Sequence, residues 1–234
     1  MPLFARLLSR DLVQILVKMN ASIGLAYDVQ KSRKDHEDMR FYFNSRWKNG
    51  QSNFRFDTDY RFGKVNEEIS EDRFQADLRF RRNKPGNLFT QTRSRYKTDG
   101  IREIDHFFEQ HLGVGWQWFA SPRLKLVGGP EMAVHFRDLD VSNEELGGWS
   151  YLGSFFQDSE FQISDVYQLD QEAHAYVDPE DRENWGYTLE MMLTGKISQG
   201  FSLRLGYEYN YDNQVPQRVP QEEISFLSSL MYTF

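Results

Sequence analysis

Apolar and polar residues alternate along several segments of this chain, and this alternation restricts the folds open to it. Segment 53–62 reads NFRFDTDYRF, and segment 201–212 reads FSLRLGYEYNYD. In a strand, successive side chains point to opposite faces, so each segment has one apolar face and one charged face. An α-helix would mix the two sets, because its period is 3.6 residues. Both segments are therefore predicted to be β-strands.

The same period of two recurs along the chain and predicts about twelve strands. Each of the clearest segments is long enough to cross a bilayer at the usual tilt, which takes about 9 to 11 residues. Residues 161–171 fit less well, because Asp165 interrupts the apolar face. The expected strands are 17–30, 39–48, 53–62, 73–81, 88–97, 106–119, 123–136, 149–157, 161–171, 185–198, 201–212 and 223–234.

The connections between these strands alternate in length. The short ones are 49–51, 83–87, 120–122, 158–160 and 199–200, and the long ones are 31–37, 63–71, 98–105, 137–148, 172–184 and 213–222. Outer-membrane barrels have short periplasmic turns and longer extracellular loops, whereas a soluble β-sandwich has no reason to follow this order. No stretch approaches the 18 apolar residues of a spanning helix. We predict an all-β fold, a closed antiparallel up-and-down transmembrane β-barrel of about twelve strands.

The composition agrees with alternation. Hydrophobic residues make up 39% of the chain and aromatic residues 15%, while the mean hydropathy is -0.68. Alternating faces hide apolarity from such an average. The net charge of -7 argues against a nucleic-acid partner, because phosphate binding needs a coherent basic face.

The first residues, MPLFARLLSRDLVQILVK, make a poor signal peptide. The apolar stretch 12–17 is short, Gln14 interrupts it and Asp11 precedes it. We expect an N-terminal segment at 1–18, interpreted as a remnant of an export region, followed by one barrel domain at 19–234.

The C-terminal strand ends LMYTF, with aromatic residues alternating to Phe234, and resembles the assembly signal of bacterial outer-membrane barrels. Together with YEYNYDNQVP at 207–216 and the glycine-rich LGVGWQWFASPRLKLVGGPEMAV at 112–134, the chain from about 20 to 234 resembles the family of salt-induced outer-membrane proteins, domain of unknown function 481. It departs from that family after the first strand and at Gln221-Glu222, which stands where an Asp is expected. The resemblance implies a Gram-negative outer-membrane barrel that the barrel-assembly machinery recognises through its C-terminal strand. It implies no established chemistry.

The charged faces would project into one lumen. In the structural interpretation, salt bridges between these charges hold the interior together. In the functional interpretation, the lumen is a narrow, porin-like passage for small ions, and its arginine-rich side favours anions. Twelve strands lie between filled eight-stranded barrels and open porins, so size leaves both open. The candidate lumen charges are Arg55, Asp57, Asp59, Arg61, Arg73, Asp77, Arg79, Arg81, Arg93, Arg95, Glu109, Lys125, Glu131, Arg204 and Glu208.

Several aromatic residues are placed to contact outer-membrane lipid. We expect them in the interfacial girdles of a monomeric barrel. In the alternative, a soluble ligand-binding β-barrel, they would pack its core. They are Trp47, Trp116, Trp118, Tyr207, Tyr209, Tyr211, Tyr232 and Phe234.

The sequence favours neither an enzyme nor a metal or other cofactor site. His106 and His111 lie five residues apart, which puts them on opposite faces of a strand, and no G-x-S-x-G motif is present. An outer-membrane hydrolase is the alternative. Two acidic stretches, 137–145 and 177–184, lack the order of a calcium loop, so solvated loops are favoured over calcium sites.

Overall fold

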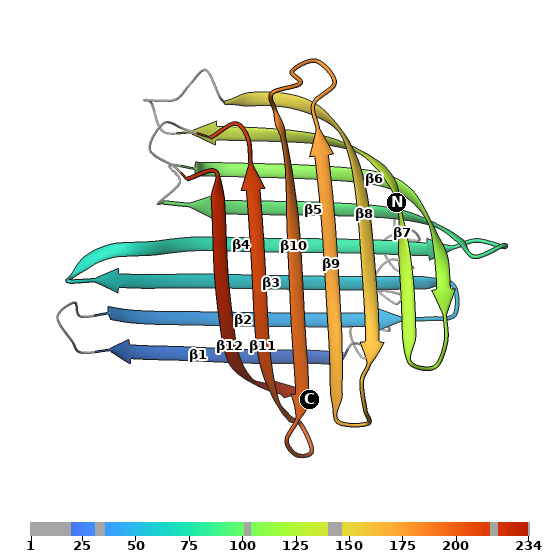
Figure 1. The fold of residues 1–234 in the computed structure, drawn as a ribbon, viewed down its shortest axis with the longest axis horizontal. Coiled ribbons are helices and arrows are strands. Elements are labelled where there is room, and N and C mark those ends of the chain that lie inside the picture. The colour runs from blue at the N-terminus through green and yellow to red at the C-terminus, as the bar shows by residue number, and fades with distance from the viewer. Residues whose placement is uncertain (1–19, 31–35, 101–103, 140–146, 216–219, 234) are drawn as a thin grey trace, which may run out of the picture.

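The computed structural model describes residues 20–30, 36–100, 104–139, 147–215 and 220–233, and these residues form a closed barrel. Each strand is antiparallel to its neighbours in the chain, and β1 closes the ring by pairing with β12 (Figure 1). The predicted twelve-stranded fold is confirmed. The strands are β1 (Asn20–Gln30), β2 (His36–Lys48), β3 (Ser52–Val65), β4 (Glu68–Asn83), β5 (Leu88–Asp99), β6 (Ile104–Ala120), β7 (Leu124–Leu139), β8 (Gly148–Gln162), β9 (Tyr167–Val177), β10 (Trp185–Lys196), β11 (Phe201–Asp212) and β12 (Glu222–Thr233).

The sequence expectations for a membrane-spanning helix and for the N-terminal segment can be compared with the described residues. None of the described residues forms a helix long and apolar enough to cross a membrane. The expected N-terminal segment 1–18 lies outside the described residues, so the division at residue 18 stays a prediction.

The barrel has an apolar exterior and a charged interior. Met132 is 76% exposed and Phe226 80% exposed, whereas Arg79 and Asp77 are buried. This distribution is the reverse of that in a soluble protein, where charged groups are rarely buried and apolar side chains fill the core. It follows from the period-two sequence, because each strand sends alternate side chains to opposite sides of the wall.

The connection expected at 63–71 is wrong. β3 and β4 continue to a tight turn at Asn66 and Glu67, which have φ of 52° and 70°. Positive φ at both central residues belongs to the tight hairpin turns that follow the twist of the strands. Residues 66–70 are all exposed, so no apolar face marks this part of the hairpin in the sequence.

The boundary between the eighth and ninth strands is also wrong. The turn expected at 158–160 lies at 163–166, so β8 extends to Gln162 and β9 begins at Tyr167. The Ser164 hydroxyl accepts hydrogen bonds from the backbone N–H groups of Val166 and Tyr167, which fixes this turn. The interrupted alternation at Asp165 was therefore the signal of a turn.

Glycines allow β6 and β7 to approach closely beside the lumen. A Cβ on Gly129 would lie 2.2 Å from the Val114 carbonyl oxygen, and one on Gly113 would lie 2.5 Å from Cγ of Glu131. The glycine at 113 thus leaves room for the Glu131 side chain, whose Cα pairs directly with it.

Candidate functional site in the barrel lumen

Two rows of like charge face each other across the lumen. The arginine row consists of Arg55, Arg79 and Arg93, which are direct partners on β3, β4 and β5. The carboxylate row runs along β8 to β11, again through direct partners. Like charges that are direct partners repel one another, so each row needs the opposite row to be stable. The carboxylate row consists of Asp158, Glu172, Glu190 and Glu208.

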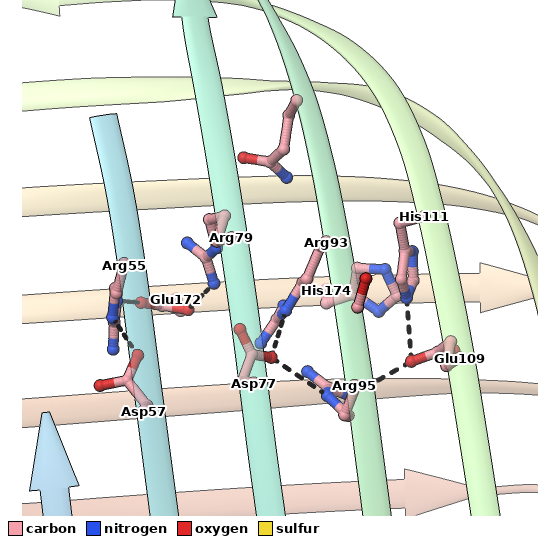
Figure 2. Close-up of polar contacts among 12 residues, drawn as sticks. Arg55, Asp57, Asp77, Arg79, Arg93, Arg95, Glu109, His111, Glu172 and His174 are labelled. Atoms are coloured by element: carbon pink, nitrogen blue, oxygen red, sulfur yellow. Dashed lines mark hydrogen bonds and ion pairs between the residues drawn. The ribbon is translucent and has the colours of Figure 1, made fainter. Parts of the chain in front are cut away.

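Glu172 joins the two rows. One of its oxygens accepts a hydrogen bond from Nη2 of Arg79 at 2.6 Å, and the other accepts one from Nη1 of Arg55 (Figure 2). β9 is a barrel neighbour of neither β3 nor β4, so both contacts cross the lumen. Asp158 adds a second crossing, at 3.2 Å from Nη1 of Arg79, and also pairs with Arg81.

Two more ion pairs cross the lumen nearer the end of the barrel where the β3–β4 turn lies. Arg61 contacts Glu208 at 2.7 Å, joining β3 to β11, and Arg73 contacts Glu223 at 2.6 Å, joining β4 to β12. Each of these arginines also contacts an aspartate on its own wall of the barrel. The charges of facing walls therefore neutralise each other inside the barrel.

Besides two larger cavities, of about 480 Å³ beside Arg61 and about 330 Å³ beside Arg81, the barrel holds small cavities along the lumen. One of about 70 Å³ is lined by Arg46, Arg81 and Lys125, and one of about 130 Å³ is lined by Phe107, His135 and Tyr176. A third, of about 80 Å³, lies around the arginine row. These volumes hold a few water molecules each.

The family model for proteins of unknown function, DUF481, matches residues 23–234. The chain belongs to this family. No curated protein sequence matches the chain. Among solved structures, the NanC porin is similar at a TM-score of 0.51 and 11% identity, covering 92% of this chain and 96% of the porin. At that identity the likeness shows the fold alone.

Two further structures are less similar. The translocator domain of the autotransporter NalP from Neisseria meningitidis has a TM-score of 0.49 and 11% identity, covering 99% of this chain and 96% of that domain. The KdgM porin has a TM-score of 0.49 and 9% identity, covering 92% of this chain and 99% of the porin.

The other predicted lumen residues lie in smaller contacts. Asp77 accepts from Arg93 and Arg95, and Arg95 also lies 3.5 Å from Glu109. The guanidinium of Arg204 lies 4.9 Å from the ring centroid of Tyr42. Two further aspartates on β3 pair with arginines of the same wall, Asp57 with Arg55 and Asp59 with Arg40 and Arg61.

Lys125 has a weak, exposed pairing compared with the ion pairs that cross the lumen. It lies at the turn end of β7 and contacts Glu160 at 3.4 Å, and its side chain is 33% exposed. An exposed pair of this kind adds little to stability.

The predicted aromatic residues form clusters on the outer wall. Trp118 stacks on Phe155 at 6.0 Å, and Tyr209 stacks on Tyr187 at 5.4 Å. Tyr232 packs on Phe201 at 5.0 Å, near the start of β11 and the end of β12. Phe234 lies outside the described residues. Contact of these rings with lipid stays a prediction. The remaining predicted members are Trp47, Trp116, Tyr207 and Tyr211, on β2, β6 and β11.

Of the two acidic stretches, the one at 177–184 is an ordered loop. The Asp178 carboxylate accepts hydrogen bonds from the backbone of Glu180 and Asp181 and from the Asn184 amide, so these oxygens support the loop. Most of the other stretch, 140–145, lies outside the described residues.

The sequence interpretation missed one cluster, formed by His111, Glu131 and His174. His106 and His111 do lie on opposite faces: His106 is hydrogen-bonded to Tyr96 on the exposed side, and His111 is fully buried. The partners of His111 are on β7 and β9, far away in the sequence. In the sequence, the pattern Glu109-x-His111 places two polar side chains on the inward face of one strand, and this could have indicated a polar cluster. No sequence spacing indicates that His174 would join them.

Proposed function

We propose that the chain spans the bacterial outer membrane as a monomeric barrel whose lumen is closed at rest by the ion pairs between the arginine row and the carboxylate row. Exposed apolar side chains along the strands support the membrane location, because such a surface suits acyl chains. Leu112 and Met132 are direct partners on β6 and β7, and they are 65% and 76% exposed. The fold that the NanC porin shares is compatible with it.

The observation that carries the closed lumen is the double contact of Glu172 with Arg55 and Arg79. Charged groups from opposite walls meet there instead of lining a wide opening. Ions pass only when these contacts open, so the barrel is an occluded passage in which small ions are the permeating partners. Outer-membrane lipid and the barrel-assembly machinery, acting on the C-terminal strand, complete the proposed partners. The proposal includes no catalysis.

Planar-bilayer recording of the refolded chain tests this proposal. The wild type is expected to insert without steady conductance. The variant Arg79→Glu/Arg81→Glu sets carboxylates opposite Asp158 and Glu172, so repulsion should open the lumen and give conductance steps that favour cations. The control Arg82→Glu/Lys84→Glu makes the same charge change at two exposed positions and should stay silent.

Each contrary outcome refutes a separate part of the proposal. Steady wide steps in the wild type would show that the lumen is open. Failure of the folded chain to enter vesicles would instead refute the membrane location.

A further inference from the structure

Two histidines and a glutamate from three strands meet beside the lumen. His111 comes from β6, Glu131 from β7 and His174 from β9, and one ligand atom of each lies within 4.8 Å of the other two. Their exposed fractions are 0%, 4% and 6%. Figure 2 shows the rings of His111 and His174 side by side, with Glu109 below them.

The distances suit a metal ion. Oε2 of Glu131 lies 3.3 Å from Nδ1 of His111 and 3.6 Å from Nε2 of His174. Ligands bound at 2.0 to 2.1 Å in a tetrahedron are about 3.3 to 3.4 Å apart. The two separations from Glu131 are thus near those that an ion between the ligands would require, and the ligand atoms of the two histidines lie within 4.8 Å of each other.

Neighbouring groups orient these ligands. Nε2 of His111 lies 2.9 Å from Oε2 of Glu109, which leaves Nδ1 facing Glu131. Gln91 donates a hydrogen bond to Oε1 of Glu131 at 2.6 Å, which leaves Oε2 facing the two rings. Metal-bound histidines usually donate their second ring N–H to a carboxylate, and bound carboxylates are themselves hydrogen-bonded.

The cluster is incomplete as a set of hydrogen bonds. Nδ1 of His111, Oε2 of Glu131 and Nε2 of His174 make no hydrogen bond within the part of the chain that the structure describes. Nε2 of His111 and Oε2 of Glu109 also make no hydrogen bond there, although they lie 2.9 Å apart. A neutral imidazole carries a single N–H, so with that N–H on the side of Glu109 the Nδ1 atom of His111 is a lone-pair acceptor facing the carboxylate of Glu131. A cation between the three atoms would satisfy all of them.

We propose that His111, Glu131 and His174 bind one divalent transition-metal ion of the Zn²⁺ class. Two imidazoles and one carboxylate suit such ions, whereas Ca²⁺ and Mg²⁺ prefer oxygen ligands alone. Three protein ligands leave a fourth position open. His174 and Glu109 line the 130 Å³ cavity, which gives water or an exchanging ligand access to that position.

Co²⁺ titration of the full chain, refolded without a histidine tag and freed of metal, tests the proposal. The chain has no cysteine, so thiolates cannot compete. One equivalent is expected to bind with the visible absorption of a four-coordinate site, and Zn²⁺ should displace it. His111→Gln and His174→Gln should each weaken binding about 100-fold or more, and Glu109→Gln about 10-fold to 100-fold.

His135→Gln is the matched control. His135 is also buried and lines the same cavity, but it is outside the cluster, so binding should be unchanged. Equal affinity in wild type, His111→Gln and His174→Gln would overturn the proposal. If a variant fails to fold, the wild type decides: absence of the four-coordinate Co²⁺ spectrum from the folded chain overturns the proposal as well.

Discussion

Replacing Glu172 with Gln should weaken the barrel and open its lumen. The substitution keeps the size of the side chain and removes the charge that Arg55 and Arg79 share. Breaking a buried pair by removing one partner costs about 3 to 5 kcal/mol. Both arginines keep a second carboxylate, Asp57 for Arg55 and Asp158 for Arg79. The lower end of the range, about 3 kcal/mol, is therefore expected.

The matched control is Glu160→Gln. Glu160 is 55% exposed and pairs with the 33% exposed Lys125 at 3.4 Å. Exposed pairs contribute about 0.2 to 1 kcal/mol, so this variant should stay within 1 kcal/mol of wild type. The two substitutions change the same group and differ only in burial and in the number of partners.

Urea unfolding of the refolded chain in lipid vesicles, followed by tryptophan fluorescence, gives the free energies. The double variant Glu172→Gln/Arg79→Gln should cost less than the sum of the two single variants, because both remove the same contact. In bilayers Glu172→Gln should show conductance steps that favour anions, since the arginine row is then in excess. If Glu172→Gln costs no more than Glu160→Gln, the pairs that cross the lumen do not hold the barrel.

Two further substitutions test the outer wall and the contact of β6 with β7. Met132→Arg should lower the free energy of unfolding in vesicles by about 2 to 4 kcal/mol if the exposed wall faces lipid. The control Ile163→Arg, at an exposed position in a turn, should lower it by less than about 0.5 kcal/mol. Equal small losses in urea titration would contradict a lipid-facing wall. Gly129→Ala should lower the free energy of unfolding by about 1 to 3 kcal/mol, because its Cβ would clash with Val114. Gly153→Ala should leave it unchanged in the same titration, since its Cβ would meet its nearest atom at 3.9 Å. No loss in Gly129→Ala would refute the close approach of β6 and β7.

Alternation along single strands predicted the fold well. In 53–62 every second residue except Thr58 is aromatic, and the structure places this segment within β3 with its charges in lumen contacts. Prediction failed where a strand no longer needs one apolar face. Residues 66–70, which include the turn at Asn66 and Glu67, are all exposed, so no pattern marks the turn.

The partners across the lumen could not be predicted. Arg55 and Glu172 are 117 residues apart, and no pattern within either strand indicates that β3 faces β9. That relationship depends on strand number and stagger, which set the barrel's shape. The sequence therefore predicted a charged interior without predicting which charges meet.

The lumen holds two kinds of polar cluster, and they differ in what completes them. Arginines carry five donors and carboxylates only acceptors, so each contact between the arginine row and the carboxylate row joins a donor to an acceptor. In the cluster of His111, Glu131 and His174, ring nitrogens and a carboxylate oxygen converge with too few hydrogens among them. Burial makes such a deficit costly, about 1 to 3 kcal/mol per unsatisfied group. Contacts between donors and acceptors of the protein thus join the ion-pair rows, whereas the histidine cluster gathers acceptors that the proposed cation would satisfy.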